Sequence, residues 1–410
     1  MPQNHSQYSK WIKENSVSFR TVDPTDDDFS DLAGLKEMIA DARIVQLGEQ
    51  SHGDGTCFET KIRLIKFLHQ EMGFDVLAFE SGLYDCRRAW QAFEDGESSQ
   101  AAAAQGVFAI WTQSKQTEEL WKYLGSQANS ESPLELCGFD CQFTASASRE
   151  DLLEDLEDLI NTFELDIEQN QLENLRIQLK QILTEDSQRQ DLRVLQESIA
   201  SLTAACQQVL DGQSRESTDA KRLNFWIQNL ASIRGFAEYS WSDSSDDSHF
   251  QISARDHLMA KNLSWLANEY YRDRKIIVWG ASFHIMRNPS EIEVPSGLVD
   301  YSNMVQMGHH LHEEFADELF TIGFTAFQGS AGNCFRAPFA LPTAPDGTLE
   351  FMIDEAGIEN GIVAMPDSQR HDWAEEKIMA RPLGYTWMKA DWGRIFDAMV
   401  FNKEMKPSTR

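Results

Sequence analysis

The chain has 410 residues, of which 66 are acidic and 36 basic, giving a formal net charge of −30 at pH 7. No local basic patch is evident in the sequence, so this charge argues against binding to nucleic acid or to anionic lipid. The hydrophobic content of 41% and the charged content of 25% are ordinary for a folded globular protein. The length fits one large α/β domain with an embellishment.

The termini and the cysteines indicate the compartment. Residues 1–13 lack the apolar core of a signal peptide, and no run of about 18 apolar residues occurs in the chain. Cys137 and Cys141 are too widely spaced for a Cys-x-x-Cys redox or zinc motif. We therefore predict a soluble, cytoplasmic protein whose six cysteines are reduced thiols, mostly in the core.

Hydrophobic periodicity predicts alternating helices and strands in the first third of the chain. Helices are expected at 8–14, 31–40, 56–72, 84–93 and 116–128, with a loop or weak helix at 96–106, and strands at 44–47, 74–79 and 134–139. In the helix over 56–72, the apolar residues share one face, so Lys61 and Lys66 are expected to face solvent.

The middle of the chain changes character. Leucine-rich helical patterns dominate from 148 to 240, which predicts a helical insertion between an α/β segment at 1–147 and a second one at 241–410. A polar loop is expected at 240–249. In the helix after it, Arg255 shares a face with Met259, Asn262 and Leu266, and a guanidinium on an apolar face requires a partner. The carboxylates at the strand ends are the expected partners.

The last third of the chain resumes the α/β pattern. A strand is predicted at 275–280, a helix at 304–311 and a strand at 319–324, followed by a turn-rich region at 328–372 and a closing element of the sheet at 392–401. The predicted fold class is α/β, with a central, largely parallel sheet, helices on both faces and an inserted helical subdomain.

Four predicted strands each end at or near a carboxylate or a histidine. Glu49 and His52 follow the first strand, Glu80 the second, Asp140 the third, and His284 the strand at 275–280. Ligands of open α/β sheets bind in the crevice outside the carboxyl ends of the strands, so these side chains are expected to form one site.

Four blocks of the sequence resemble the erythromycin esterase family, which also contains members labelled succinoglycan biosynthesis proteins. These blocks are Gly48-Glu49-Gln50-Ser51-His52-Gly53, residues 73–80 (GFDVLAFE), residues 255–262 (RDHLMAKN) and residues 278–284 (VWGASFH). Two segments, Thr56-Cys57 and Ala281-Ser282-Phe283, depart from the pattern of many members and leave the substrate open.

The resemblance implies a hydrolase that opens a macrolide lactone without a metal or other cofactor. A histidine would act as the general base on water, a task that suits an imidazole because its ordinary pKa lies near working pH. Carried over block by block, the roles fall on His52 as the base, Glu49 and Glu80 as its carboxylate neighbours, His284 as the second imidazole and Arg255 as the cationic partner. Asp140 and Ser51 are predicted to contact the substrate.

Each of these residues also has a structural interpretation. His52 could cap the helix that follows it, Glu80 and Arg255 could form a buried ion pair, and His284 could be a satisfied core histidine. His309 and Glu313 form an i, i+4 pair that invites a metal, but no third ligand is evident and a solvated helix start is favoured. No Ser lies in a Gly-x-Ser-x-Gly elbow, and a nucleophilic role for Cys57 is disfavoured.

The sequence therefore predicts a hydrolase of a carboxylic ester, with a small-molecule ester as its substrate. Two alternatives remain open at this point. The same histidines and carboxylates could hold a divalent metal in a metal-dependent hydrolase, or the chain could be a non-catalytic member that binds a small molecule or saccharide. The identity of the ester, the mobility of the helical insertion and the oligomeric state are not determined by the sequence.

Overall fold

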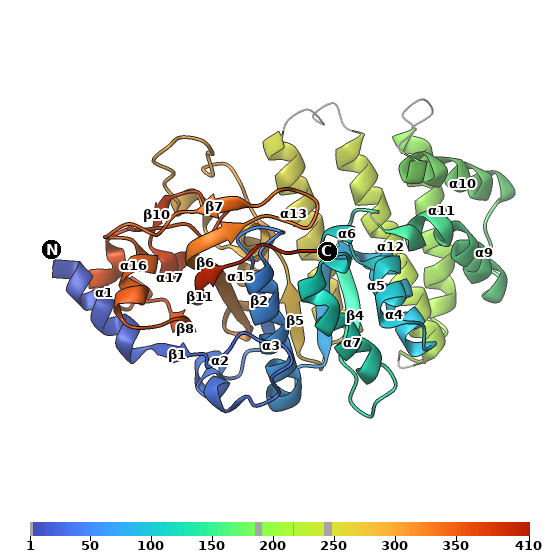
Figure 1. The fold of residues 1–410 in the computed structure, drawn as a ribbon. Coiled ribbons are helices and arrows are strands. Elements are labelled where there is room, and N and C mark those ends of the chain that lie inside the picture. Colours follow the sequence, from blue (N-terminus) through green and yellow to red (C-terminus); the bar gives the residue numbers. More distant parts are fainter. Residues whose placement is uncertain (1–2, 144, 185–190, 216, 242–247) are drawn as a thin grey trace.

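A computed structural model describes residues 3–143, 145–184, 191–215, 217–241 and 248–410. A twisted sheet runs through the middle of the molecule, and helices cover it (Figure 1). The strand order is β1-β8-β11-β6-β2-β5-β3-β4, with β7 paired to β6. These strands span Ser16–Ser18 (β1), Ile44–Leu47 (β2), Val76–Gly82 (β3), Glu135–Asp140 (β4), Ile276–Trp279 (β5), Leu319–Ala331 (β6), Phe339–Leu341 (β7), Asn360–Ala364 (β8) and Ala398–Met405 (β11).

The strands from β11 to β4 all run parallel, which confirms the predicted, largely parallel sheet. In the same sheet, β1 pairs antiparallel with β8, β8 with β11, and β7 with β6. A two-stranded sheet of β9 (Ile378–Ala380) and β10 (Met388–Ala390) stands apart. The element expected to close the sheet forms α17 (Trp392–Ile395) and β11, but β11 lies between β8 and β6. That part of the prediction was wrong. The edge of the sheet beyond β11 is formed by β8 and β1, which lie in regions where no strand was predicted.

The alternation of side chains along the central strands explains why both faces are covered. Val45 of β2 and Leu77 of β3 belong to one hydrophobic cluster, whereas Ile44 and Val76, one residue earlier, belong to the other. Successive side chains of a strand point to opposite faces. A fully apolar strand of this kind therefore needs a helical layer on each side.

The helices of one face surround Val45 and Leu77. They are α2 (Leu35–Ile39), α3 (Gly55–Met72), α4 (Leu83–Glu94), α5 (Ser99–Gly106), α6 (Ala109–Thr112) and α7 (Glu118–Gln127). The region at 96–106, expected as a loop or weak helix, contains α5. The expectation that Lys61 and Lys66 face solvent was wrong, since both side chains are buried. Lys66 pairs with Asp27 at 2.6 Å, and Lys61 belongs to the candidate site.

The other face carries α1 (Gln3–Glu14), α15 (Met307–Phe315), α16 (Leu349–Glu355) and a stack of further helices, most of them long. This stack contains α8 (Ser146–Glu150), α9 (Leu152–Thr162), α10 (Gln169–Thr184), α11 (Leu192–Leu210), α12 (Thr218–Ser240) and α13 (Ser248–Trp265). Most of the stack extends beyond β4 at the right of Figure 1. Most of the loop predicted at 240–249 lies outside the described residues.

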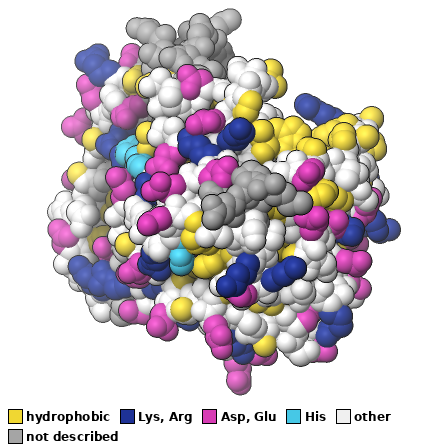
Figure 2. All heavy atoms as spheres, turned by 90° about the vertical axis from the view of Figure 1, so that its left-hand side faces the viewer, with side chains coloured by type: hydrophobic (Ala, Val, Ile, Leu, Met, Phe, Trp, Pro, Cys, Tyr) yellow, Lys and Arg dark blue, Asp and Glu magenta, His cyan; other side chains and the backbone are white. Residues whose placement is uncertain are grey.

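The hydrophobic residues of the long helices, such as Leu159 and Leu230, share a cluster with strand residues of the sheet. No helix among the described residues is both long and apolar enough to cross a membrane. All six cysteines are free, and Cys334 is the one that is partly exposed. On the face shown in Figure 2, acidic and basic side chains are interspersed, and hydrophobic side chains gather at the upper right.

Candidate functional site

Four adjacent parallel strands, β2, β5, β3 and β4, bring the predicted residues together. Glu49 and His52 follow β2, His284 lies on α14 (Ser282–Ile285) just after β5, Glu80 is in β3, and Asp140 ends β4. Although β5 comes about 200 residues after β3 in the chain, it lies between β2 and β3 in the sheet. The sheet order therefore places two segments that are distant in sequence side by side.

His52 and Glu49 form the first half of the site. The Nδ1 atom of His52 lies 2.6 Å from Oε1 of Glu49. Glu49 also accepts hydrogen bonds from Nζ of Lys61 at 3.1 Å and from Nε1 of Trp111 at 3.3 Å. The Glu49 and Lys61 side chains are fully buried, whereas 40% of the His52 side chain is exposed. The imidazole thus has a buried, fixed partner on one nitrogen and reaches solvent elsewhere.

Aromatic rings hold this half in place. Trp111 packs edge-on against His52, with ring centroids 5.1 Å apart, and against Phe79 at 5.2 Å. Phe79 stacks on Trp279, and the ammonium of Lys61 lies 3.9 Å from the centroid of the Trp279 ring. A cation over an aromatic face is stabilised where water is excluded. This contact explains how a lysine is accommodated in an apolar layer.

Glu80, Arg255 and His284 form the second half. Oε1 of Glu80 lies 3.4 Å from Nε2 of His284, 4.0 Å from Nε2 of His52 and 3.4 Å from a guanidinium nitrogen of Arg255. The other Glu80 oxygen accepts the backbone N–H of Ala281 at 2.7 Å. One carboxylate oxygen therefore faces both imidazoles.

Arg255 links the two ends of this half. Its guanidinium binds Asp140 through two nitrogens, at 3.2 and 2.5 Å, and a third nitrogen lies 3.2 Å from Nε2 of His284. Asp140 and Glu80 are the strand-end carboxylates expected as its partners. Because a guanidinium only donates, its bond to Nε2 places the proton of neutral His284 on Nδ1, which faces Asp256 at 3.0 Å.

The electrostatics follow from these neighbours. Burial disfavours the charged form of His52, but the hydrogen bond to Glu49 and the charge of Glu80 outweigh it and raise its pKa above the ordinary 6.5. Burial acts in the same way on His284, and Asp256 and Glu80 raise its pKa. For Glu80, burial opposes ionisation, yet His284, His52 and Arg255 lower its pKa to about 2. Both imidazoles are thus tuned to accept a proton.

Ser51 is the remaining predicted residue. It is half-buried in the loop between β2 and α3 that carries His52, and its carbonyl oxygen accepts the Gly53 N–H at 2.7 Å. His309 lies 3.7 Å from Glu313, as their spacing indicated. Among the residues that the structure describes, no group of three or more His, Cys, Asp or Glu side chains has the arrangement of a metal site.

Comparison with known proteins gives the family. The family model described as erythromycin esterase matches residues 69–405, which is most of the chain. The chain belongs to the erythromycin esterase family. Membership supports hydrolase activity.

Individual relatives agree with this assignment. The chain is 27% identical over 98% of its length to a Bacillus subtilis (strain 168) protein named "Putative hydrolase YbfO", of which 92% is covered. It is 22% identical to an Escherichia coli protein named erythromycin esterase type II, over 87% of this chain and 88% of that one. A crystal structure of a succinoglycan biosynthesis protein has the same fold, with a TM-score of 0.73 at 17% identity, covering 99% of this chain and 98% of that one.

Sequence reasoning missed several residues of the candidate site. Lys61 and Asp256 hold Glu49 and His284, and Trp111 contacts both Glu49 and His52. Asp256 stands next to Arg255 within a family-like block, which is the signal that could have found it. Lys61 gave no such signal, because one lysine on an amphipathic helix is ordinarily exposed.

A buried carboxyl group next to the loop that carries His52 was also missed. Asp54 precedes α3 and is fully buried, and neither of its carboxyl oxygens has a hydrogen-bond partner among the described residues. Burial raises the pKa of Asp54 to about 8. The loop carrying Tyr385 is tied to the site because the Gly384 N–H donates to the Gln50 carbonyl at 2.9 Å.

Proposed function

We propose that the protein is a metal-independent hydrolase of carboxylic esters in which His52 activates the attacking water. The observation that carries the proposal is the 2.6 Å contact between His52 Nδ1 and Glu49. When Nδ1–H donates to the carboxylate, the lone pair of Nε2 is free to take a proton from water, and Glu49 stabilises the imidazolium that results. The solvent exposure of His52 gives water access to it.

The second half of the site has the charges that ester hydrolysis requires. Attack of water on an ester carbonyl builds negative charge on the carbonyl oxygen, and preorganised donors stabilise that charge. Arg255 is the donor we assign to this task, and His284 can join it when it is protonated, with Glu80 and Asp140 fixing their positions. The pKa of His284 is raised, so this histidine takes up a proton readily. In its protonated form it can donate that proton to the leaving alkoxide.

The guanidinium of Arg255 supports chemistry without a metal. It lies 3.2 Å from Nε2 of His284 and 3.4 Å from Glu80 Oε1, and so contacts two of the groups that a divalent ion would require as ligands. A permanently charged guanidinium among these groups supplies the positive charge that a Lewis acid would otherwise bring.

Apolar surface beside the site favours an ester with a large apolar part, such as a macrolide lactone. Phe335 and Phe339 are 46% and 50% exposed, on a segment that follows β6. A hollow of about 490 Å³ is lined by Phe339, Pro342, Tyr385 and Trp387, among others. The same segment packs closely on the loop that carries His52. Even a Cβ atom added to Gly53 of that loop would lie only 2.5 Å from the Asn333 backbone nitrogen.

The test is turnover of a panel of activated esters and macrolides by the purified protein, with and without a chelator. We expect hydrolysis that survives chelation and is lost in His52→Ala. Activity that disappears on chelation and returns with a divalent ion would support the metal-dependent alternative. Silence across the panel, with saturable binding of a saccharide or macrolide, would support a protein that only binds.

A further inference from the structure

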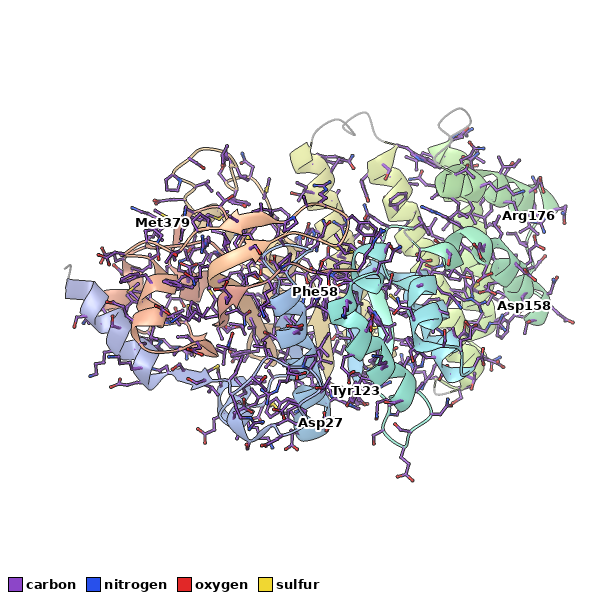
Figure 3. The ribbon with its side chains drawn as sticks, in the orientation of Figure 1. Asp27, Phe58, Tyr123, Asp158, Arg176 and Met379 are labelled. Atoms are coloured by element: carbon purple, nitrogen blue, oxygen red, sulfur yellow. The ribbon has the colours of Figure 1, made fainter. Side chains whose placement is uncertain are left out.

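A second hollow extends along α4 toward the end of the sheet opposite the histidines. It has a volume of about 580 Å³ and is bounded by α4, α9, α12, the start of β4 and the segment that leads into β5. Glu135, at its wall, begins β4, whereas Asp140 of the candidate site ends that strand. Five steps of about 3.3 Å separate them by roughly 17 Å. Asp158, another lining residue, is labelled on α9 in Figure 3.

The lining of this hollow is cationic although the chain as a whole is acidic. Five basic residues contribute to it against three acidic ones, and the basic residues are Arg87, Arg88, Lys221, Arg222 and Arg274. They come from three distant parts of the chain, which is why no basic patch was evident in the sequence. The local excess of positive charge stands against 66 acidic and 36 basic residues overall.

The three acidic residues of the lining are already occupied. Glu135 accepts from the hydroxyl of Tyr271 at 2.6 Å and from Arg274 at 2.5 Å. Asp158 pairs with Arg222 at 2.7 Å. The third, Asp155, accepts from the Tyr84 hydroxyl at 2.6 Å and lies 3.6 Å from Nε of Arg88. These contacts neutralise three of the five cations.

Two of the five basic residues of the lining, Arg87 and Lys221, have no acidic partner in it. Among the described residues, no carboxylate lies within 4 Å of the charged nitrogens of Arg87 or Lys221. Arg87 donates to the hydroxyl of Tyr270 at 3.0 Å, and its guanidinium lies over the Phe225 ring at 5.8 Å. A half-buried guanidinium held by an aromatic ring and a hydroxyl is fixed in position and still lacks an anion.

The end of a helix adds to the positive character of the hollow. Thr218 is the first residue of α12, a helix of 23 residues, and it lines the hollow together with Lys221. The amino end of a helix carries partial positive charge and favours anions. Phe225 and Trp226, one turn further along α12, supply apolar surface next to these charges.

We propose that this hollow binds a phosphorylated small molecule of about nucleotide size, with Arg87 and Lys221 contacting the phosphate. The planar guanidinium of arginine matches the oxygens of a phosphate group in two-point hydrogen bonding. The volume falls within the range of small-molecule sites in proteins. The flanking rings of Phe225, Trp226 and Tyr270 fit the sugar or base that carries the phosphate.

The experiment is isothermal titration calorimetry of the full chain at low salt with three probes: pyrophosphate, ADP and ribose 5-phosphate. We expect saturable binding of at least one probe, weakened about tenfold or more by Arg87→Gln and by Lys221→Gln. Tighter binding of ADP than of the other two would assign a nucleotide, and tighter binding of ribose 5-phosphate a sugar phosphate. Equal binding of pyrophosphate would assign the phosphate group alone.

Arg193→Gln is the matched control, because Arg193 on α11 is 79% exposed and lies outside the hollow. This variant should bind as tightly as the unaltered protein. Lys221 is exposed, so Lys221→Gln keeps the test valid if Arg87→Gln fails to fold. The proposal is overturned if the unaltered protein binds none of the three probes, or if Lys221→Gln binds them as tightly as the control.

Discussion

Glu80 holds one carboxylate oxygen between two imidazoles, 3.4 Å from Nε2 of His284 and 4.0 Å from Nε2 of His52. The two histidines follow different strands and lie more than 200 residues apart in the chain. Because the same negative charge raises the pKa of both imidazoles, a proton taken up by either one weakens that effect on the other. The two histidines therefore titrate as a pair, and four predictions depend on this arrangement and its supports.

Replacement of His52 by alanine should lower ester turnover by about 10²–10⁴-fold, because a general base contributes on that scale. The fold should persist, since 40% of the side chain is exposed. Steady-state kinetics with circular dichroism would test both statements. His257→Ala is the control, because His257 is exposed on α13 next to Asp256 and lies outside the proposed chemistry. Unchanged turnover in a folded His52→Ala variant contradicts the assignment.

The pH dependence of kcat/KM should show an acid limb above pH 6.5. A base must be unprotonated, and the pKa of His52 is raised, so activity should fall as pH drops through that raised value. Glu49→Gln removes the carboxylate bonded to the imidazole and should move the limb to lower pH. A limb that stays in place in Glu49→Gln would mean that another group titrates.

Replacement of Lys61 by methionine should destabilise the protein by about 3–5 kcal/mol, because it leaves Glu49 as a buried charge without its cation. The acid limb should also move to higher pH, since Glu49 would act on His52 without a competing cation. Urea unfolding and pH–rate profiles measure the two effects. Lys66→Met is the matched control: it also removes a buried, paired lysine, but Lys66 pairs away from the histidines, so only stability should change.

Stability at acid pH should depend on Glu80. Its pKa is lowered from 4.5 to about 2, so the stabilisation from its charge is present above pH 4.5 and is lost as pH falls toward 2. The shift corresponds to about 3 kcal/mol at 1.4 kcal/mol per pKa unit. The difference in unfolding free energy between the unaltered protein and Glu80→Gln should therefore shrink over that pH range. A difference that is constant between pH 6 and 2 would contradict this account.

The sequence predicted the central strands well because each is a short, wholly apolar run that leaves few alternatives to a buried strand. It also predicted which strand ends bring polar side chains into one cluster, since Glu49, Glu80, Asp140 and His284 each follow such a run. The family resemblance added the roles proposed for these residues. The helical insertion at 148–240 and the contact of Ser51 with substrate stay predictions.

What the sequence could not supply was the neighbourhood created by long-range packing. Lys61 was predicted to face solvent because helical periodicity says nothing about partners from other elements. In the structure, Glu49 and the Trp279 ring contact its ammonium group. Strand β8 was not predicted because its residues, at 360–364, lie in a region rich in turn-forming residues. The position of β11 inside the sheet could not be read from a local pattern.

The interleaved strand order has a consequence for synthesis on the ribosome. When β2, β3 and β4 have emerged, the place between β2 and β3 is still vacant, and it is filled only after a further 135 residues, when β5 arrives. Until then the first three strands cannot complete their hydrogen-bond ladder, and such late, non-local pairing slows folding. The emerging amino-terminal third is therefore a nascent chain with open strand edges, the kind of intermediate that chaperones protect from aggregation.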